Sequence, residues 1–228
     1  MAGSTTGVTG QFRLKEDVPV SSRATKLWRL SAHWGCNAIL ALLWGKFALN
    51  AYNRWVHSGS LILLGLVLFN TLLVTVTIAR RPSVSTSTQI KDWLAAVLTV
   101  GLSMAFRPWG WHQSFAQAAG SILQGIGLII MTVALTNLGR SFGIVAANRG
   151  IKRSGLYGWV RHPLYGGELI FFTGFLLTTF SPYNLIVWFG MLVGLVIRSW
   201  AEEDHLSRDP EYQAYMKAVP YSFFPKLF

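Results

Sequence analysis

Residues 155–167 bring together side chains that can do chemistry at a membrane surface. The segment holds Arg161 and His162 directly before Pro163, together with two tyrosines and four glycines. It lies between two long apolar segments, and ionisable groups beside hydrocarbon are costly unless they serve a function. A second polar cluster, residues 198–205, follows the next long apolar stretch. Together the two clusters predict a polar pocket at the membrane surface, and we expect the function to depend on it.

The Arg-His-Pro sequence is typical of a chain that enters a helix. Pro163 suits the first turn, where its missing N–H group is not needed. Gly166 and Gly167 leave room for another group to approach the backbone. The free N–H groups and the positive dipole end of such a helix favour an anionic group nearby. The alternative interpretation is an interfacial loop in which Arg161 and His162 face lipid headgroups.

Glu168 favours the functional interpretation of this segment. It lies one turn into the expected helix, at membrane depth. A carboxylate there needs a partner, and Arg161, His162 or Arg198 can provide one.

The second cluster combines an arginine with several acidic residues. Arg198 and Glu202 are four residues apart and share one face of a helix, while Glu203 lies on the neighbouring edge. The alternative interpretation is an ordinary ion pair at the end of a membrane helix. The further acid at Asp204 makes the ion-pair interpretation less favoured, because the positive-inside bias does not require acidic residues at the end of a membrane helix. Carboxylates only accept hydrogen bonds, so an acidic pair suits a ligand that is positively charged or bears hydroxyl groups.

The elements that must position these clusters are apolar helices. The chain of 228 residues is 52% hydrophobic and 13% charged, whereas soluble domains average roughly 25% charged residues. We therefore expect an all-α, polytopic membrane protein with about four spans, a C-terminal helical hairpin and an amphipathic C-terminal helix. The apolar segments lie at residues 30–52, 60–79, 93–106, 116–138, 164–180 and 183–200.

Short signals connect these segments. Ser181 and Pro182 predict a tight joint within the hairpin of residues 164–200, because proline is tolerated at a helix start. The glycines of the fourth segment, Gly120, Gly125 and Gly127, predict close approach of a neighbouring helix. Residues 209–216 read as a capped amphipathic helix, with Asp209 at its N-cap.

The basic residues indicate how the chain is oriented. The net charge is +11, but the charges lie in loops between apolar segments rather than in one basic stripe, so we expect no nucleic-acid partner. Arginines and lysines gather before the first span, between the second and third, after the fourth and in the tail. This bias predicts that both termini, and both polar clusters, lie on the cytoplasmic side. For residues 138–144 we expect interfacial anchoring.

The residues of the two clusters resemble a known family. Residues 135–228 are similar to the isoprenylcysteine carboxyl methyltransferase family and to the related phospholipid N-methyltransferases. The resemblance rests on the order and spacing of glycines, tyrosines and the Arg-His-Pro group, then an arginine with two acids, then two tyrosines. These motif residues are Gly155, Tyr157, Val160, Arg161, His162, Pro163, Tyr165, Gly167, Arg198, Glu202, Glu203, Tyr212, Tyr215 and Val219.

The resemblance implies an integral-membrane methyltransferase that uses S-adenosylmethionine. From composition we expect a polar N-terminal segment (1–29) and a four-span region (30–138), and the resemblance implies a cofactor-binding catalytic region (139–228). The cofactor would be reached from the cytosol, and a lipidic or amphiphilic acceptor would enter from the bilayer. Arg198 and Glu203 would be catalytic. The residues implied for cofactor binding are Tyr157, Val160, Arg161, His162, Pro163, Tyr165, Gly166, Gly167, Glu202, Glu203 and Tyr212.

Several alternatives stay open at this point. The family favours an acceptor like an isoprenylcysteine carboxylate, but an ethanolamine-type amine, an isoprenoid hydroxyl or a small thiol is also compatible. An amine would need a base, for which Glu203 or Glu168 is the candidate. Other functions to consider are a sterol-reductase-type enzyme with a nicotinamide cofactor and a non-catalytic binding or transport protein. No spacing among His, Cys, Asp and Glu resembles a closed metal site.

Overall fold

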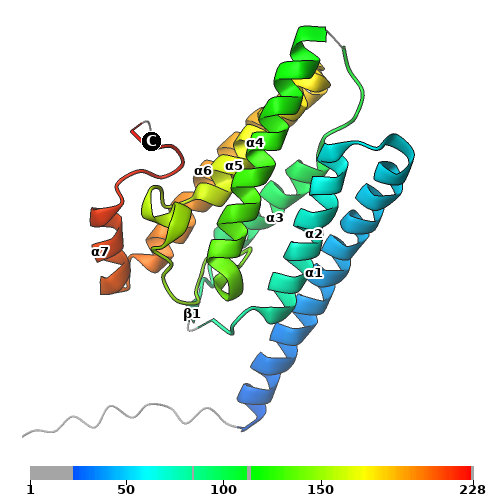
Figure 1. Cartoon of the computed structure of the whole chain (residues 1–228). Coiled ribbons are helices and arrows are strands. Elements are labelled where there is room, and N and C mark those ends of the chain that lie inside the picture. Colours follow the sequence, from blue (N-terminus) through cyan, green and yellow to red (C-terminus); the bar gives the residue numbers. More distant parts are fainter. Residues whose placement is uncertain (1–22, 84, 112–113, 227–228) are drawn as a thin grey trace, which may run out of the picture.

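The structure is a computed structural model that describes residues 23–83, 85–111 and 114–226, with side chains from Trp34 onward. Most of the polar segment expected for residues 1–29 lies outside this range. The described residues form seven α-helices and almost no strand, which confirms the all-α prediction (Figure 1). The helices are α1 (Arg23–Ser58), α2 (Leu61–Ala79), α3 (Ile90–Ala105), α4 (Ser114–Leu138), α5 (Pro163–Thr178), α6 (Pro182–Leu206) and α7 (Pro210–Ala218).

Three helical stretches of the described chain are long and apolar enough to cross a bilayer. They are Leu61–Ala79, Phe115–Ser141 and Pro182–Leu206. Helices α3 and α5 have 16 residues each, or ~24 Å at 1.5 Å per residue. They are therefore shorter than the ~30 Å hydrocarbon core of a typical bilayer. These lengths and compositions are those of an integral membrane protein.

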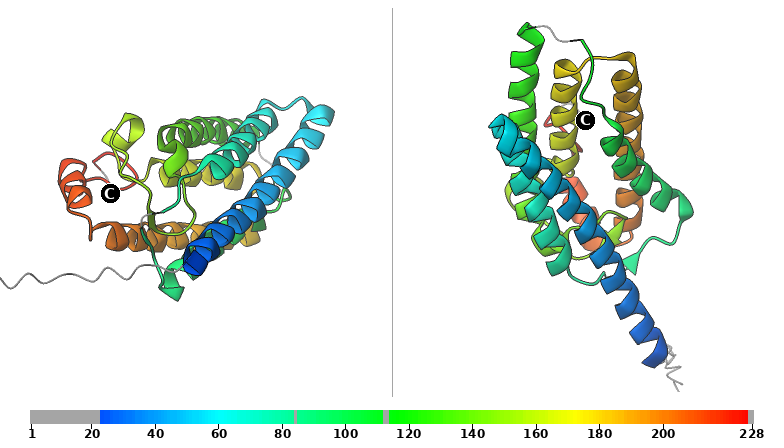
Figure 2. Two further views of the ribbon diagram at one scale, coloured as in Figure 1. Left: turned by 90° about the horizontal axis from the view of Figure 1, so that it is seen from below. Right: turned by 90° about the vertical axis from the view of Figure 1, so that its right-hand side faces the viewer.

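The helices pack mainly in three pairs. Helix α1 lies along α2, α4 along α5, and α3 along α6 (Figure 2). The turn between α1 and α2 passes through Gly59, whose φ of 66° is left-handed and suits glycine. Helices α2, α4 and α6 end at the same end of the bundle, where α5 begins (Figure 1). We call this the pocket end, because both polar clusters lie there.

Glycines set the close contact between α4 and α5. A Cβ atom placed on Gly127 would lie 2.5 Å from the backbone nitrogen of Phe171. One placed on Gly120 would lie 2.6 Å from the carbonyl oxygen of Gly174. The predicted close approach is therefore confirmed at these two positions. A Cβ on Gly125 would meet nothing within 4 Å, so that glycine takes no part in the contact.

Polar side chains point inward in this bundle, and many large apolar ones point outward. Asn184, Thr77 and Thr99 are fully buried, whereas Leu61 and Phe115 are almost wholly exposed. A protein surrounded by hydrocarbon is expected to show this distribution. The apolar core that α2, α4 and α5 share includes Phe69, Leu73, Leu128, Met131, Leu135 and Phe171.

The caps of the last helices agree with the sequence signals. Ser181 caps α6, since its hydroxyl accepts a hydrogen bond from the backbone N–H of Asn184 at 3.1 Å. Asp209 caps α7 by accepting from the N–H of Glu211 at 2.9 Å. Pro163 is the first residue of α5, as predicted. These short caps fix where α5, α6 and α7 begin and hence how they surround the pocket end.

A short two-stranded ribbon and two 3-10 turns complete the pocket end. Strand β1 (Ser85–Thr86) pairs antiparallel with β2 (Ala147–Asn148). The 3-10 turn η1 (Gly139–Ser141) follows α4, and η2 (Gly155–Gly158) precedes α5. The chain from η1 through β2 to η2 therefore folds across the ends of the long helices, which brings it over both polar clusters.

Candidate functional site

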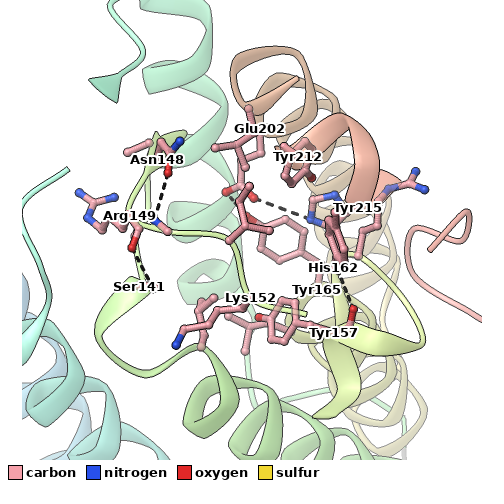
Figure 3. A pocket seen from close by; sticks show the side chains of 18 of the residues that line it. Ser141, Asn148, Arg149, Lys152, Tyr157, His162, Tyr165, Glu202, Tyr212 and Tyr215 are labelled. Carbon is pink, nitrogen blue, oxygen red and sulfur yellow. Dashed lines mark hydrogen bonds and ion pairs between the residues drawn. The ribbon is translucent and has the colours of Figure 1, made fainter. Parts of the chain in front are cut away.

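A polar pocket opens at the pocket end of the bundle, as the two sequence clusters predicted (Figure 3). Its empty volume is about 820 Å³, including the space at its mouth. The lining comes from the η1–β2 loop, η2, the start of α5, the end of α6 and α7. Six of the residues expected to bind a cofactor line it: Tyr157, Arg161, His162, Tyr165, Glu202 and Tyr212.

His162 lies between the two adjacent acids of α6. Its Nε2 is 2.8 Å from Oε1 of Glu203, and its Nδ1 is 3.7 Å from Oε2 of Glu202. The ring stacks on Tyr165 with the centroids 5.3 Å apart. The two adjacent acids therefore hold the imidazole from two sides.

Arg161 joins three separate parts of the chain. Its guanidinium donates to both oxygens of Glu203, at 2.7 and 3.3 Å, in the two-pronged geometry that makes such pairs strong. It also donates to the carbonyl oxygens of Val219 and Pro220, at 2.9 and 2.6 Å, and to the hydroxyl of Ser222 at 2.7 Å. The C-terminal tail is thereby tied to α6 and to the start of α5.

Glu203 does not line the pocket, although we expected it both to bind cofactor and to take part in catalysis. Both of its oxygens accept hydrogen bonds from Arg161, and one also faces His162. The side chain is 14% exposed. In this arrangement Glu203 positions Arg161 and His162, while its neighbour Glu202 faces the pocket.

Glu202 connects the pocket to Arg198. It accepts a hydrogen bond from the hydroxyl of Tyr165, and its Oε1 lies 3.8 Å from Nε of Arg198. The guanidinium of Arg198 lies over the Tyr165 ring, 4.8 Å from the centroid, which is a cation–π contact. The expected pairing of Arg198 with Glu202 across one helical turn is confirmed. Arg198 is buried, and its Nε has no hydrogen-bond partner in the described part of the chain.

A second and larger cavity lies between the helices at membrane depth. Its empty volume is about 2400 Å³, and its lining is mainly apolar, with contributions from α1 to α6. We call it the chamber. Arg198 and Glu168 line it at the pocket end. Leu164 and Tyr165 line both the chamber and the polar pocket, so the two spaces meet at these side chains.

The segment after η1 forms a wall between the two spaces. Phe142 and Ile144 line the chamber, whereas Gly143 and Val145 line the polar pocket. Such alternation is what an extended chain produces, since successive side chains point to opposite sides. We expected interfacial anchoring for this segment, and the structure instead shows it between two cavities.

Several pocket residues carry no signal that sequence reasoning could use. Asn148, Arg149 and Lys152 follow the wall segment, in a loop without apolar periodicity. Asn148 donates to the carboxylate of Asp209 at 2.9 Å, which connects this loop to the cap of α7. Ser141 also lines the pocket and donates to the carbonyl of Arg149 at 3.1 Å.

The tyrosines around the pocket remain protonated at neutral pH. Burial raises the pKa of Tyr157 well above its ordinary value, and the charge of Glu202 adds to the effect. Burial also raises the pKa of Tyr212, with the charge of Glu203 next in size. The pKa of Tyr215 is raised to about 12, again mainly by burial. Its hydroxyl donates to the carbonyl of Tyr157 at 2.7 Å. The hydroxyls of Tyr157 and Tyr212 are therefore protonated and can donate a hydrogen bond to a ligand, while that of Tyr215 is already used.

The remaining predicted residues support the pocket without lining it. Val160 is buried, and Pro163 starts α5. Gly166 faces the tail, since a Cβ there would lie 2.9 Å from the carbonyl oxygen of Phe223. Gly167 faces α4, since a Cβ there would lie 3.0 Å from the backbone nitrogen of Met131. The glycines thus allow other parts of the backbone to come close.

The fold and site together define a class of protein. It is an integral membrane protein with a polar pocket that meets a cavity between its membrane helices. Residues 115–213 match the family model of the phospholipid methyltransferases. This match confirms the resemblance inferred from the motifs. The match supports a membrane methyltransferase in general. No curated protein matches the chain.

Proposed function

We propose that this protein transfers a methyl group from S-adenosylmethionine to a lipidic or amphiphilic acceptor. The observation that supports this most directly is that the residues matched by the family model include those that separate the polar pocket from the chamber and nearly all of those that line the polar pocket. The family match, residues 115–213, includes the wall between the polar pocket and the chamber and every lining residue of the polar pocket except Tyr215. The cofactor would occupy the polar pocket, and the acceptor would occupy the chamber.

The side chains of the polar pocket fit S-adenosylmethionine chemically. When bound, this cofactor supplies an electrophilic methyl group on a positively charged sulfur. Glu202 would accept hydrogen bonds from its ammonium group. Lys152 and Asn148 would bind its carboxylate. The faces of Tyr157 and Tyr212 suit a flat base or a sulfonium, because aromatic faces attract cations.

The chamber suits an acceptor with an apolar body and one polar end. Its lining is mainly apolar, and its polar side chains at the pocket end are Arg198 and Glu168. The Nε of Arg198 is unpartnered in the described chain, so it can bind an oxygen of the acceptor. Tyr165 lies at the contact of the two spaces and is placed to hold the acceptor close to the methyl donor.

The work of these residues would be positioning and exclusion of water. A methyl group moves by in-line displacement, so holding both reactants in line supplies much of the rate. A carboxylate or thiolate acceptor carries no proton to remove. An amine or hydroxyl acceptor does, and Glu168 is the carboxylate on the chamber wall that would take it. The loop charges support a cytoplasmic location for both termini and the polar pocket.

The test uses the purified full-length protein with methyl-labelled S-adenosylmethionine and a total lipid extract of its host. We expect label in a lipid-soluble product. Glu202→Gln should lose most of it, while Asp204→Asn should keep it, because Asp204 is exposed and pairs only with Arg208 at 3.9 Å. Labelling with prenylated cysteine, ethanolamine phospholipid, isoprenoid alcohol and thiol in separate reactions then identifies the acceptor.

Two outcomes would contradict the proposal. Equal labelling by Glu202→Gln would remove the polar pocket from the reaction. No binding of S-adenosylmethionine, with measurable binding of a nicotinamide dinucleotide, would favour the reductase alternative.

A further inference from the structure

A group of arginines lies beside the polar pocket, around the last residues of α2. Arg140 donates from Nε to the carbonyl oxygen of Ala79 at 2.9 Å. Arg149 donates from Nε to the carbonyl oxygen of Arg81 at 3.2 Å. Arg80 donates from Nε to the side chain of Asn37 on α1. We call Arg80, Arg81, Arg140 and Arg149 the basic cluster.

The acidic side chains in the described residues do not neutralise the basic cluster. None of its arginines takes part in the ion pairs found there. The carboxylates have other neighbours instead. Asp92 accepts from Ser87, Glu168 lines the chamber, Glu202 and Glu203 hold His162, Asp204 pairs with Arg208, Asp209 accepts from Asn148, and Glu211 pairs with Arg153.

The absence of a counter-charge is costly at two of these positions. Arg80 is only 7% exposed, and the Asn37 side chain that accepts from its Nε is neutral. Burying a cation without an anionic partner is unfavourable. The pKa of Arg149 is lowered to about 10, first by burial and then by the charge of Arg80, and the smaller opposing effect of Glu202 does not offset them. The like charges are therefore near enough to repel one another.

The carbonyl groups of Ala79, at the end of α2, and of Arg81, just after it, offset part of this cost, since the C-terminal end of a helix attracts cations. These contacts use only the Nε group of Arg140 and of Arg149. The terminal NH₂ groups of both guanidinium groups make no hydrogen bond to other described residues. Figure 3 shows the Arg149 guanidinium pointing away from the centre of the polar pocket. Arg149 lines the polar pocket with part of its side chain, and its guanidinium is directed toward the edge of that pocket.

We propose that the basic cluster binds a phosphate group, and that the ligand is the headgroup of an anionic phospholipid in the adjacent leaflet. Guanidinium groups bind phosphate oxygens through two parallel hydrogen bonds, which the free NH₂ groups can form. The cluster lies where two membrane-spanning helices end, at the depth of lipid headgroups. Anionic leaflets attract such basic segments. The site lies beside the polar pocket and shares Arg149 with it, but lipid binding here does not require methyl transfer.

The test measures lipid binding by the full-length protein in a neutral detergent. Dioleoyl phosphatidic acid is compared with dioleoyl phosphatidylcholine and with soluble glycerol phosphate, by native mass spectrometry and by thermal unfolding. We expect phosphatidic acid to bind and to raise the unfolding temperature more than phosphatidylcholine. The double variant Arg140→Gln/Arg149→Gln should bind it at least about tenfold more weakly, as expected when charged hydrogen bonds are lost.

The matched control removes the same charge elsewhere. Arg208→Gln/Lys217→Gln alters two exposed cations and should bind phosphatidic acid like the unchanged protein. Equal weakening by both double variants would show an effect of net charge alone and would overturn the proposal. Glycerol phosphate that binds as tightly as the lipid would identify a soluble phosphate as the ligand and overturn the lipid assignment. If the test variant does not fold, Arg140→Gln alone, at an exposed side chain, must still weaken binding.

Discussion

Replacing the two adjacent acids of α6 one at a time should separate a structural role from a binding role. Glu203 has a buried, two-pronged ion pair with Arg161 and a further contact with His162. In Glu203→Gln the amide oxygen can take the place of Oε1 and keep the contacts with Arg161 Nε and His162. The amide NH₂ then takes the place of Oε2 and faces an Arg161 NH₂ group, which is also a donor. Breaking a buried ion pair costs about 3–5 kcal/mol. Because one oxygen is retained, we expect Glu203→Gln to lower the free energy of unfolding by about 2–4 kcal/mol.

Glu202→Gln should behave differently. The glutamine oxygen can still accept from Tyr165, and the ion pair that is lost, with Arg198, is long at 3.8 Å. We therefore expect a loss of only about 1 kcal/mol in the free energy of unfolding. The same change removes a charged acceptor from the polar pocket. Affinity for S-adenosylmethionine should fall by about 10- to 100-fold, the value of one hydrogen bond to a charged group.

The assay is thermal or denaturant unfolding in detergent, followed by tryptophan fluorescence, together with calorimetric titration of S-adenosylmethionine. We expect Glu203→Gln to lose mainly stability and Glu202→Gln to lose mainly affinity for S-adenosylmethionine. The reverse pattern would refute this expectation, because Glu203 would then contact the ligand directly. Equal loss of stability in both variants would also refute it, since it would show that the two acids act as one unit.

Three further substitutions test the packing around the site, each by the change in the free energy of unfolding. Gly127→Ala should cost about 1–3 kcal/mol, because its Cβ would be 2.5 Å from the α5 backbone, while Gly125→Ala should not destabilise. Tyr215→Phe should cost about 1–3 kcal/mol by leaving the buried carbonyl of Tyr157 without its donor. Asp209→Ala should cost about 1 kcal/mol as a lost helix cap, and should also accelerate proteolysis of the 148–152 loop. A neutral result for Gly127→Ala, Tyr215→Phe or Asp209→Ala would contradict the contact that the substitution tests.

The sequence predicts the helices of this protein well, because each long apolar run becomes one helix. Helix α2 ends at Ala79 and α4 ends at Leu138, as expected. The first helix is longer than its apolar run and covers Arg23–Ser58 rather than residues 30–52. Polar residues at its ends continue the helix, and apolar content alone cannot place such boundaries.

The candidate site could be predicted only in part. The motifs indicate correctly that the Arg-His-Pro segment meets the acids of α6. They do not indicate which acid faces the pocket, because neighbouring helical residues point about 100° apart and only the position of α5 selects between them. The loop that carries Asn148 and Arg149 was missed, since neither helical nor strand periodicity marks an irregular segment.

Tyr165 makes the two spaces depend on one another. Its hydroxyl donates to Glu202 on the side of the polar pocket, and its ring lies under the Arg198 guanidinium, which lines the chamber. Besides this ring contact, Arg198 has a long 3.4 Å hydrogen bond to the carbonyl of Gly143 and the 3.8 Å pair with Glu202 within the described chain. An anionic acceptor group in the chamber would compete with Glu202 for this guanidinium. A cation bound to Glu202 in the polar pocket would weaken the same pair. Binding on one side should therefore release Arg198 toward the other, which favours occupation of both spaces together.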